Sequence, residues 1–94
     1  MDILEKMQQA NWKEGDARCQ AWVAAHPNIE NNVKDASNDD LAQSIMYCQN
    51  YENIFTHELL VRAGKLDAYL ACKTAIEKSH VLSEVDNALN VIIF

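Results

Sequence analysis

The chain contains little glycine and proline, with two glycines and one proline in 94 residues. A phosphate-binding loop needs several closely spaced glycines, and Gly15 and Gly64 stand far apart, which excludes such a loop. All-β domains of this size need many tight turns and are usually richer in both residues. The composition therefore favours helices.

Long apolar runs are also missing. The longest is Val91-Ile92-Ile93-Phe94, whereas a membrane-spanning helix needs about 20 apolar residues. The sequence begins MDILEKMQQA, which is amphipathic and charged and lacks the apolar segment of a secretory leader. These features predict a cytoplasmic protein with no membrane partner.

Cysteines are few, and they are Cys19, Cys48 and Cys72. Their number is odd, they are far apart, and each falls on the apolar side of a predicted helix. Free, buried thiols in a reducing compartment fit this pattern best.

Basic residues are fewer than acidic ones: the chain has 8 lysines and arginines and 14 aspartates and glutamates, which gives a net charge of −6. A surface of this sign repels phosphate, which disfavours direct nucleic-acid binding and binding to anionic membranes. A basic protein is the natural electrostatic partner, although such a charge is also common in proteins that merely need to stay in solution.

The strongest helical pattern covers residues 38–63. Ser37 followed by Asp40 resembles a capping box at its start, and Gly64 is suited to end it. Apolar residues lie on two sides of this predicted helix, which is expected of a central helix or of one that shares a face with a partner. The alternative is a break near the middle, with Asn53 capping a separate helix over 54–63.

The rest of the chain also reads as helix. A short helix is predicted over 2–12, and a second begins near Asp16 and ends before Pro27; one bent helix over 2–26 is the alternative. Residues 27–38 are expected to form a loop. Two further helices are expected to start near Asp67 and Ser83. The sum is one all-α domain over residues 1–94, a compact bundle of four to five short helices with one long central helix (about 38–63).

No catalytic or cofactor site is predicted. Cys48 and His57 lie on opposite sides of the predicted central helix, so they cannot act as a nucleophile and base within one subunit. Glu77 and His80 have the i, i+3 spacing used in di-iron bundles, but the further ligands of such a site are missing. The sequence therefore predicts a protein that is not an enzyme and holds no metal or cofactor.

Glu52 stands in the middle of an apolar stripe, and two interpretations are open. A carboxylate there is expected to pair within the fold, with Arg18, Arg62 or a tyrosine. Alternatively, it belongs to an exposed patch and meets a cation on another protein. On that second interpretation, the predicted partner-binding residues are Asp35, Asp39, Asp40, Tyr47, Asn50, Glu52, Ile54 and His57.

The leading functional hypothesis is a small acidic protein-binding module that covers a surface of a larger, basic host protein or protein complex. By analogy of size and charge, it would be a phage or mobile-element inhibitor of a host nucleic-acid-binding defence complex, similar to anti-CRISPR or anti-restriction proteins. The alternatives are an immunity or antitoxin protein that neutralises a toxin, and a helical homodimer that binds a metal or small ligand.

Overall fold

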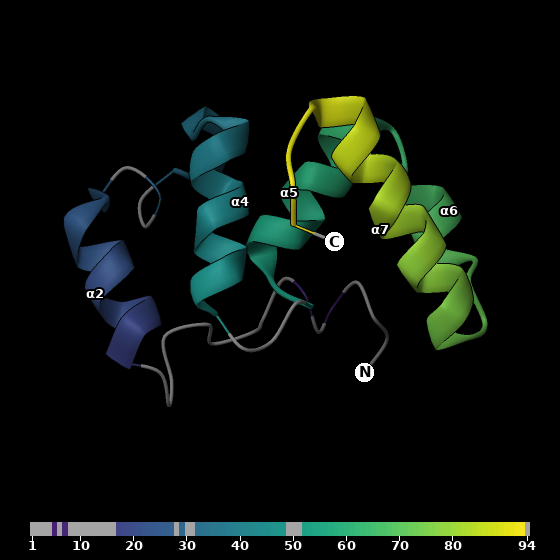
Figure 1. Ribbon diagram of the computed structural model, residues 1–94, viewed down its shortest axis with the longest axis horizontal. Helices are drawn as coiled ribbons and strands as arrows, with labels where there is room; N and C mark the ends of the chain where they lie inside the picture. The colour runs from purple at the N-terminus through teal and green to yellow at the C-terminus, as the bar shows by residue number, and fades with distance from the viewer. Residues whose placement is uncertain are drawn as a thin grey trace.

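The computed structural model in Figure 1 describes Glu5, Met7 and residues 17–27, 29, 32–48 and 52–93. Within these ranges all regular structure is helical. The elements are α2 (Ala17–Ala25), the 3-10 turn η1 (Val33–Asp35), α4 (Asn38–Tyr47), α5 (Ile54–Ala63), α6 (Leu66–Leu70) and α7 (Ala75–Leu89). The predicted all-α class is confirmed.

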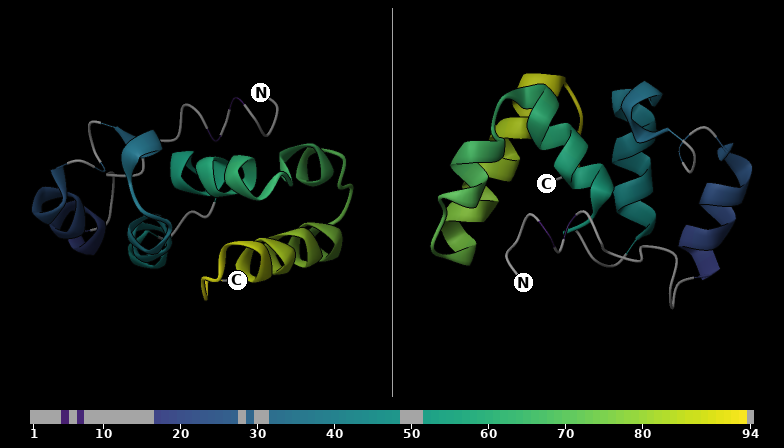
Figure 2. Two further views of the ribbon diagram at one scale, coloured as in Figure 1. Left: turned by 90° about the horizontal axis from the view of Figure 1, so that it is seen from above. Right: turned by 180° about the vertical axis from the view of Figure 1, so that it is seen from behind.

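The helices follow one another across the molecule. α2 lies at one edge beside α4, α4 packs against α5, and α5 packs against both α6 and α7 (Figures 1 and 2). The radius of gyration is 12.6 Å, close to the value of about 12 Å expected for a compact chain of this length. The compact bundle is therefore confirmed as well.

The core lies where these helices meet. Its large, fully buried side chains come from α4, α5 and α7 and from the separately described Met7 and Ile29. The largest are Phe55, Met7, Ile29, Leu41, Ile45, Leu59, Leu60 and Val85. Burying such side chains contributes roughly 1.5–3 kcal/mol each, which is the main term that holds short helices together.

The single helix predicted over 38–63 is wrong, and the alternative with a break is correct. α4 ends at Tyr47 and α5 begins at Ile54. The Asn53 side chain accepts hydrogen bonds from the backbone N–H groups of Phe55 and Thr56, at 3.0 and 3.1 Å. Asparagine satisfies helix-start donors better than it sustains a helix interior, so the chain starts a new helix there.

Other predicted ends of these two helices are confirmed. The Ser37 hydroxyl accepts a 3.0 Å hydrogen bond from Asp40 N at the start of α4. At the end of α5, Gly64 adopts a left-handed conformation with φ of 68°. Lys65 N donates to Leu60 O at 2.9 Å, which closes the helix end.

The second predicted helix is α2, and one side of it faces the core. Cys19 and Val23 are buried, while Trp22 and His26 are half-buried. The helix ends at Ala25, before Pro27, as expected. The helix predicted over 2–12 lies largely outside the described residues, as does the question of one bent helix or two.

The predicted start of the last helix near Ser83 is wrong. α7 begins at Ala75, where the Thr74 hydroxyl accepts from Glu77 N at 3.1 Å and Glu77 Oε2 accepts from Lys73 N at 2.7 Å. This reciprocal arrangement closely resembles a capping box, and it places Ser83 inside the helix. α6, a helix of five residues, begins at Leu66, next to the predicted Asp67.

The prediction of three free thiols is also wrong. Cys19 in α2 and Cys48 at the end of α4 form a disulfide with Cα atoms 5.2 Å apart, and Cys72 is free. The two helices run in opposite directions, which brings these residues together although 29 positions separate them. Within the described ranges, every helix is too short or too polar to span a bilayer.

Candidate protein-binding surface

One side of α2 and the end of α4 form a stack of aromatic and basic side chains. Arg18, Trp22 and His26 are four residues apart, so they lie on one line along α2. The Trp22 ring stacks on His26 at 3.8 Å and on Tyr47 at 5.1 Å between centroids. The Arg18 guanidinium lies 5.1 Å from the Tyr47 ring centroid. We call these four residues the aromatic layer.

Hydrogen bonds fix the aromatic layer against α4. Trp22 Nε1 donates to the buried Ser44 hydroxyl at 2.6 Å, and Ser44 donates in turn to Asp40 O at 2.7 Å. His26 Nδ1 lies 2.8 Å from Trp22 O, and because a carbonyl only accepts, Nδ1 carries the proton. Trp22, His26 and Tyr47 remain half-buried, so part of each residue is accessible to solvent.

α4 also carries a line of exposed residues, which ends at Met46, the residue before Tyr47. Asp39, Gln43 and Met46 follow at i, i+4 and i+7, and all three are exposed. Met46 is an exposed large hydrophobic residue, with 63% of its surface accessible. Methionine adapts its shape easily to a partner surface. We call these three residues the outer stripe of α4.

The predicted acidic residues gather near the start of α4. Asp35 ends η1 and its carboxylate accepts a hydrogen bond from the Asn32 side chain. Asp39 and Asp40 occupy the first turn of α4, where negative charge interacts favourably with the helix dipole. Asp35 and Asp39 are exposed and Asp40 is half-buried.

Glu52 belongs to a different part of the molecule. Its Oε1 lies 3.6 Å from Lys78 Nζ and 3.5 Å from the Tyr69 hydroxyl, which donates to it. Lys78 Nζ also lies 5.8 Å from the Tyr69 ring centroid. Glu52 therefore pairs within the fold, with a tyrosine as one of the expected partners. Among the described residues its basic partner is Lys78 on α7, in contrast to the predicted Arg18 or Arg62.

Burial and the neighbouring Glu52 both raise the pKa of Tyr69. Burial of the phenol, which is 3% exposed, disfavours its charged form, and the nearby Glu52 carboxylate acts in the same direction through its charge and its hydrogen bond. Together with a smaller effect of Cys72, they raise the pKa of Tyr69 from 10.0 to about 12. Tyr69 therefore stays protonated over the physiological pH range.

The remaining predicted residues lie on α5 or outside the described part. Ile54 begins α5 and His57 follows one turn later, both half-buried, with the exposed Val61 further along the same face. Asn50 lies outside the described residues.

The structure divides the predicted partner-binding residues among separate places. Asp39 and Tyr47 lie at opposite ends of α4, about 12 Å apart along its axis at the usual rise per residue. Glu52 faces α6 and α7 through Tyr69 and Lys78. Of the predicted partner-binding residues, Tyr47 belongs to the aromatic layer and Asp39 belongs to the outer stripe of α4.

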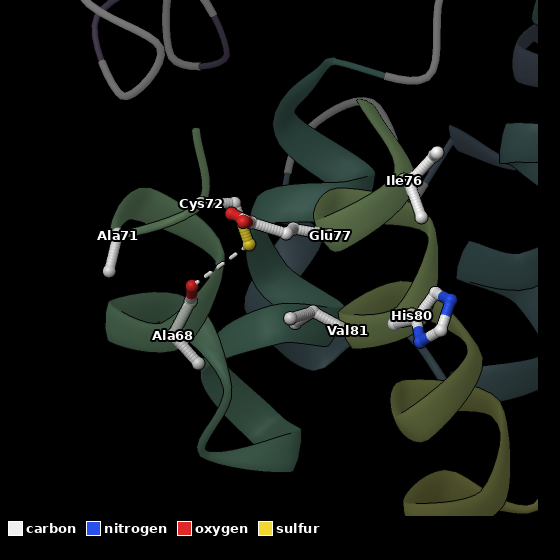
Figure 3. Close-up of a pocket in the computed structure, with 7 residues that line it drawn as sticks. All are labelled: Ala68, Ala71, Cys72, Ile76, Glu77, His80 and Val81. Atoms are coloured by element: carbon white, nitrogen blue, oxygen red, sulfur yellow. Dashed lines mark hydrogen bonds between the residues drawn. The ribbon is translucent and has the colours of Figure 1, made fainter. Parts of the chain in front are cut away.

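A shallow pocket of about 340 Å³ lies between α6 and α7. Figure 3 shows its lining, which consists of Ala68, Ala71, Cys72, Ile76, Glu77, His80 and Val81. The Cys72 thiol donates to Ala68 O at 3.2 Å, and Glu77 is engaged at the start of α7. Ile76 is 72% exposed at its rim.

The described side chains offer little for metal or nucleophilic chemistry. No group of three or more His, Cys, Asp or Glu residues in the described part of the chain is placed to hold a metal ion. Cys19 and Cys48 are joined in a disulfide, so neither supplies a thiolate in this state.

Sequence reasoning missed both the aromatic layer and the disulfide. The spacing of Arg18, Trp22 and His26 indicates that these three residues of the layer share one side of a helix, because four-residue steps align side chains on a helix. The pairing of that line with Tyr47 depends on how α2 packs on α4, which no local pattern encodes. Comparison with known protein families, with curated proteins and with solved structures finds no match for this chain.

Proposed function

We propose that this protein is a non-enzymatic protein-binding module that binds a larger, basic protein through the aromatic layer and the outer stripe of α4. The observation that carries the proposal is the stack of Arg18, Tyr47, Trp22 and His26. Tryptophan, tyrosine and arginine are the residue types most enriched where interfaces concentrate their binding energy. Here they contact one another, and Trp22 is hydrogen-bonded to Ser44, which lowers the entropic cost of fixing them against a partner.

The charge supports a basic partner. The chain carries a net charge of −6, and Asp35 and Asp39 place exposed carboxylates at one end of the outer stripe. Such a field attracts a basic surface and speeds its association. An inhibitor of a nucleic-acid-binding host complex, of phage or mobile-element origin, is the version of this function that we favour, since such a complex exposes basic surfaces. An immunity protein acting on a basic toxin would use the same surface.

A pair of matched variants tests the surface. Met46→Lys places a positive charge in the outer stripe, which a basic partner would repel, and Ile76→Lys makes the same change at a comparably exposed position on α7. Each bait, kept under non-reducing conditions, is used to recover partners from a lysate of the native host, and the eluate is quantified by mass spectrometry. We expect a stoichiometric partner that binds the unchanged protein and the Ile76 variant but is lost with the Met46 variant.

The opposite pattern would overturn the proposed surface. A partner lost with Ile76→Lys and kept with Met46→Lys would place binding at the α6–α7 pocket. Recovery of the bait alone from all three preparations would count against a host protein partner.

A cytoplasmic site of action was predicted together with free thiols, and the disulfide changes that part of the argument. Disulfides persist in oxidising compartments and are rare in the cytosol. The bridged form described here fits an oxidising environment, and we propose that this form is the one that binds through the aromatic layer.

A small-ligand function is the second candidate, and the α6–α7 pocket favours it. Its volume of about 340 Å³ lies at the lower end of the range for ligand sites, and its lining is mainly apolar. Native mass spectrometry of freshly purified protein tests this candidate. A retained mass that Ile76→Glu removes would support it, and an unmodified mass in both proteins would not.

A further inference from the structure

Among the described elements, α2 makes its main contacts with α4. Figures 1 and 2 show it at the edge of the bundle, away from α6 and α7. It has nine residues, and helices shorter than about 12 residues are marginal in water without tertiary support. The position of α2, and with it three of the four residues of the aromatic layer, therefore depends on its attachment to α4.

The disulfide is the covalent part of this attachment. Cys19 lies in the first turn of α2 and Cys48 directly follows α4, and both are buried. The noncovalent part, as far as the described residues show it, includes the buried Val23 and the contacts of Trp22 with Ser44 and Tyr47. A bridge across 29 positions restricts the chain strongly when these contacts open, so it favours their re-formation.

The other half of the bundle has its own support. α5 packs against α7, and α6 packs against both. Leu59, Leu60 and Val85 are fully buried in this half, and Tyr69 is nearly so. None of these contacts needs α2 to be in place.

We propose that the Cys19–Cys48 disulfide is a redox latch on the binding surface. When it is reduced, α2 separates from α4 and the aromatic layer comes apart, while α5, α6 and α7 stay folded. The effect on partner binding rests on the function proposed above; the separation of α2 does not.

The chemistry is a thiol–disulfide exchange with a dithiol. A thiolate of the dithiol attacks one sulfur of the bridge, and the second thiol then resolves the mixed disulfide. The bond between Cys19 and Cys48 breaks, each sulfur ends as a thiol, and the dithiol becomes a disulfide. Because both cysteines are buried, attack requires α2 to move first, so loosening α2 speeds reduction.

Amide hydrogen exchange of the full chain tests the latch. The Cys72→Ser background removes the free thiol, and dithiothreitol is the dithiol. We expect the amides of α2 to lose nearly all of their protection after reduction and to exchange almost as fast as those of an unstructured peptide, because without the cross-link α2 is mostly detached. The amides of α7 should exchange at an unchanged rate. Alkylation with iodoacetamide and intact mass verify the state of each sample.

Two controls separate the bridge from its surroundings. A Cys19→Ser/Cys48→Ser variant in the same background should match the reduced protein without any reductant. Trp22→Ala should speed the reduction of the bridge, whereas Ile76→Ala on α7 should not.

Two results would overturn the latch. Unchanged exchange in α2 after reduction would mean that packing alone holds the helix. Equally faster exchange in α2, α5 and α7 would mean that the bridge stabilises the whole fold. Partner binding is measured in a separate experiment, in which the amount of partner recovered with the oxidised bait is compared with the amount recovered with the reduced bait. Faster α2 exchange with no partner in either state would leave the latch standing and reject the proposed function.

Discussion

The Tyr69 hydroxyl donates a hydrogen bond to Glu52 across the junction of α5, α6 and α7, with 3.5 Å between the two oxygens. Lys78 Nζ approaches the same carboxylate oxygen to 3.6 Å. Glu52, a residue at the α4–α5 break, is therefore tied to the C-terminal helices. The pair has consequences for stability at high pH.

We predict that stability falls between pH 10 and 12 because of Tyr69. Its pKa is about 12 in the folded protein and 10.0 when unperturbed, so above pH 10 the unfolded chain loses a proton that the native protein keeps. The stabilisation is complete below pH 10 and is lost as the pH rises through 12, by about 2–3 kcal/mol at most. Absorbance at 295 nm should show one tyrosine that ionises late.

Substitution separates this tyrosine from the others. Tyr69→Phe should remove the late ionisation, and Tyr47→Phe should leave it in place. A late step that survives in Tyr69→Phe would show that the perturbed group is a different tyrosine.

Arg62 joins three elements, and we predict that Arg62→Ala lowers the free energy of unfolding by about 2–3 kcal/mol. Its guanidinium donates to Glu58 Oε1 at 3.1 Å, to Asn38 Oδ1 at 2.8 Å and to Lys34 O at 3.0 Å. The alanine variant lacks the guanidinium, so all of these acceptors lose a charge-assisted hydrogen bond at once. Urea denaturation measures the change. Arg62→Lys should recover less than half of it, because an ammonium cannot reach these partners in the same fork geometry.

The start of α7 gives a matched comparison between two hydroxyl residues. Thr74→Ala removes the cap on Glu77 N and should cost about 1 kcal/mol. Ser83→Ala, at an exposed position inside α7, should change stability by less than about 0.5 kcal/mol. Thermal denaturation of both variants measures this. Equal losses of stability, or a larger loss in Ser83→Ala, would show that α7 does not begin at Ala75.

Thr56 carries a buried hydroxyl without a hydrogen-bond partner in the described part of the chain. We predict that Thr56→Val, which has nearly the same shape, raises the free energy of unfolding by about 1 kcal/mol, because the burial of an unsatisfied polar group is removed. Thr56→Ser keeps the hydroxyl and removes a methyl group, so it should destabilise the protein. A loss of stability in the valine variant would indicate a hydrogen bond to that hydroxyl.

Local signals predicted the helix ends that depend on neighbouring residues. Ser37 with Asp40, Asn53 and Gly64 each act through backbone groups a few positions away, so their roles are readable from the sequence. The start of α7 was readable in the same way, since Thr74 and Glu77 have capping-box spacing. The error lay in favouring Ser83 over an equally local signal.

Long-range pairings were not readable. The sequence correctly indicated that Glu52 needs a partner, because a shielded carboxylate is costly alone. It could not single out Lys78, which is 26 positions away and is brought close by the packing of α7. The same holds for Cys19 and Cys48, whose pairing requires the antiparallel arrangement of α2 and α4. The candidate binding surface depends on that arrangement and so became visible only in the structure.

The disulfide also divides the chain mechanically. If the protein were pulled from its two ends, tension would pass from Cys19 to Cys48 through the bridge and bypass the 29 peptide steps between them. Those residues would contribute about 100 Å of extension if they were free to straighten. While the bridge is intact, α4 carries no load and the stretchable length comes mainly from the C-terminal half.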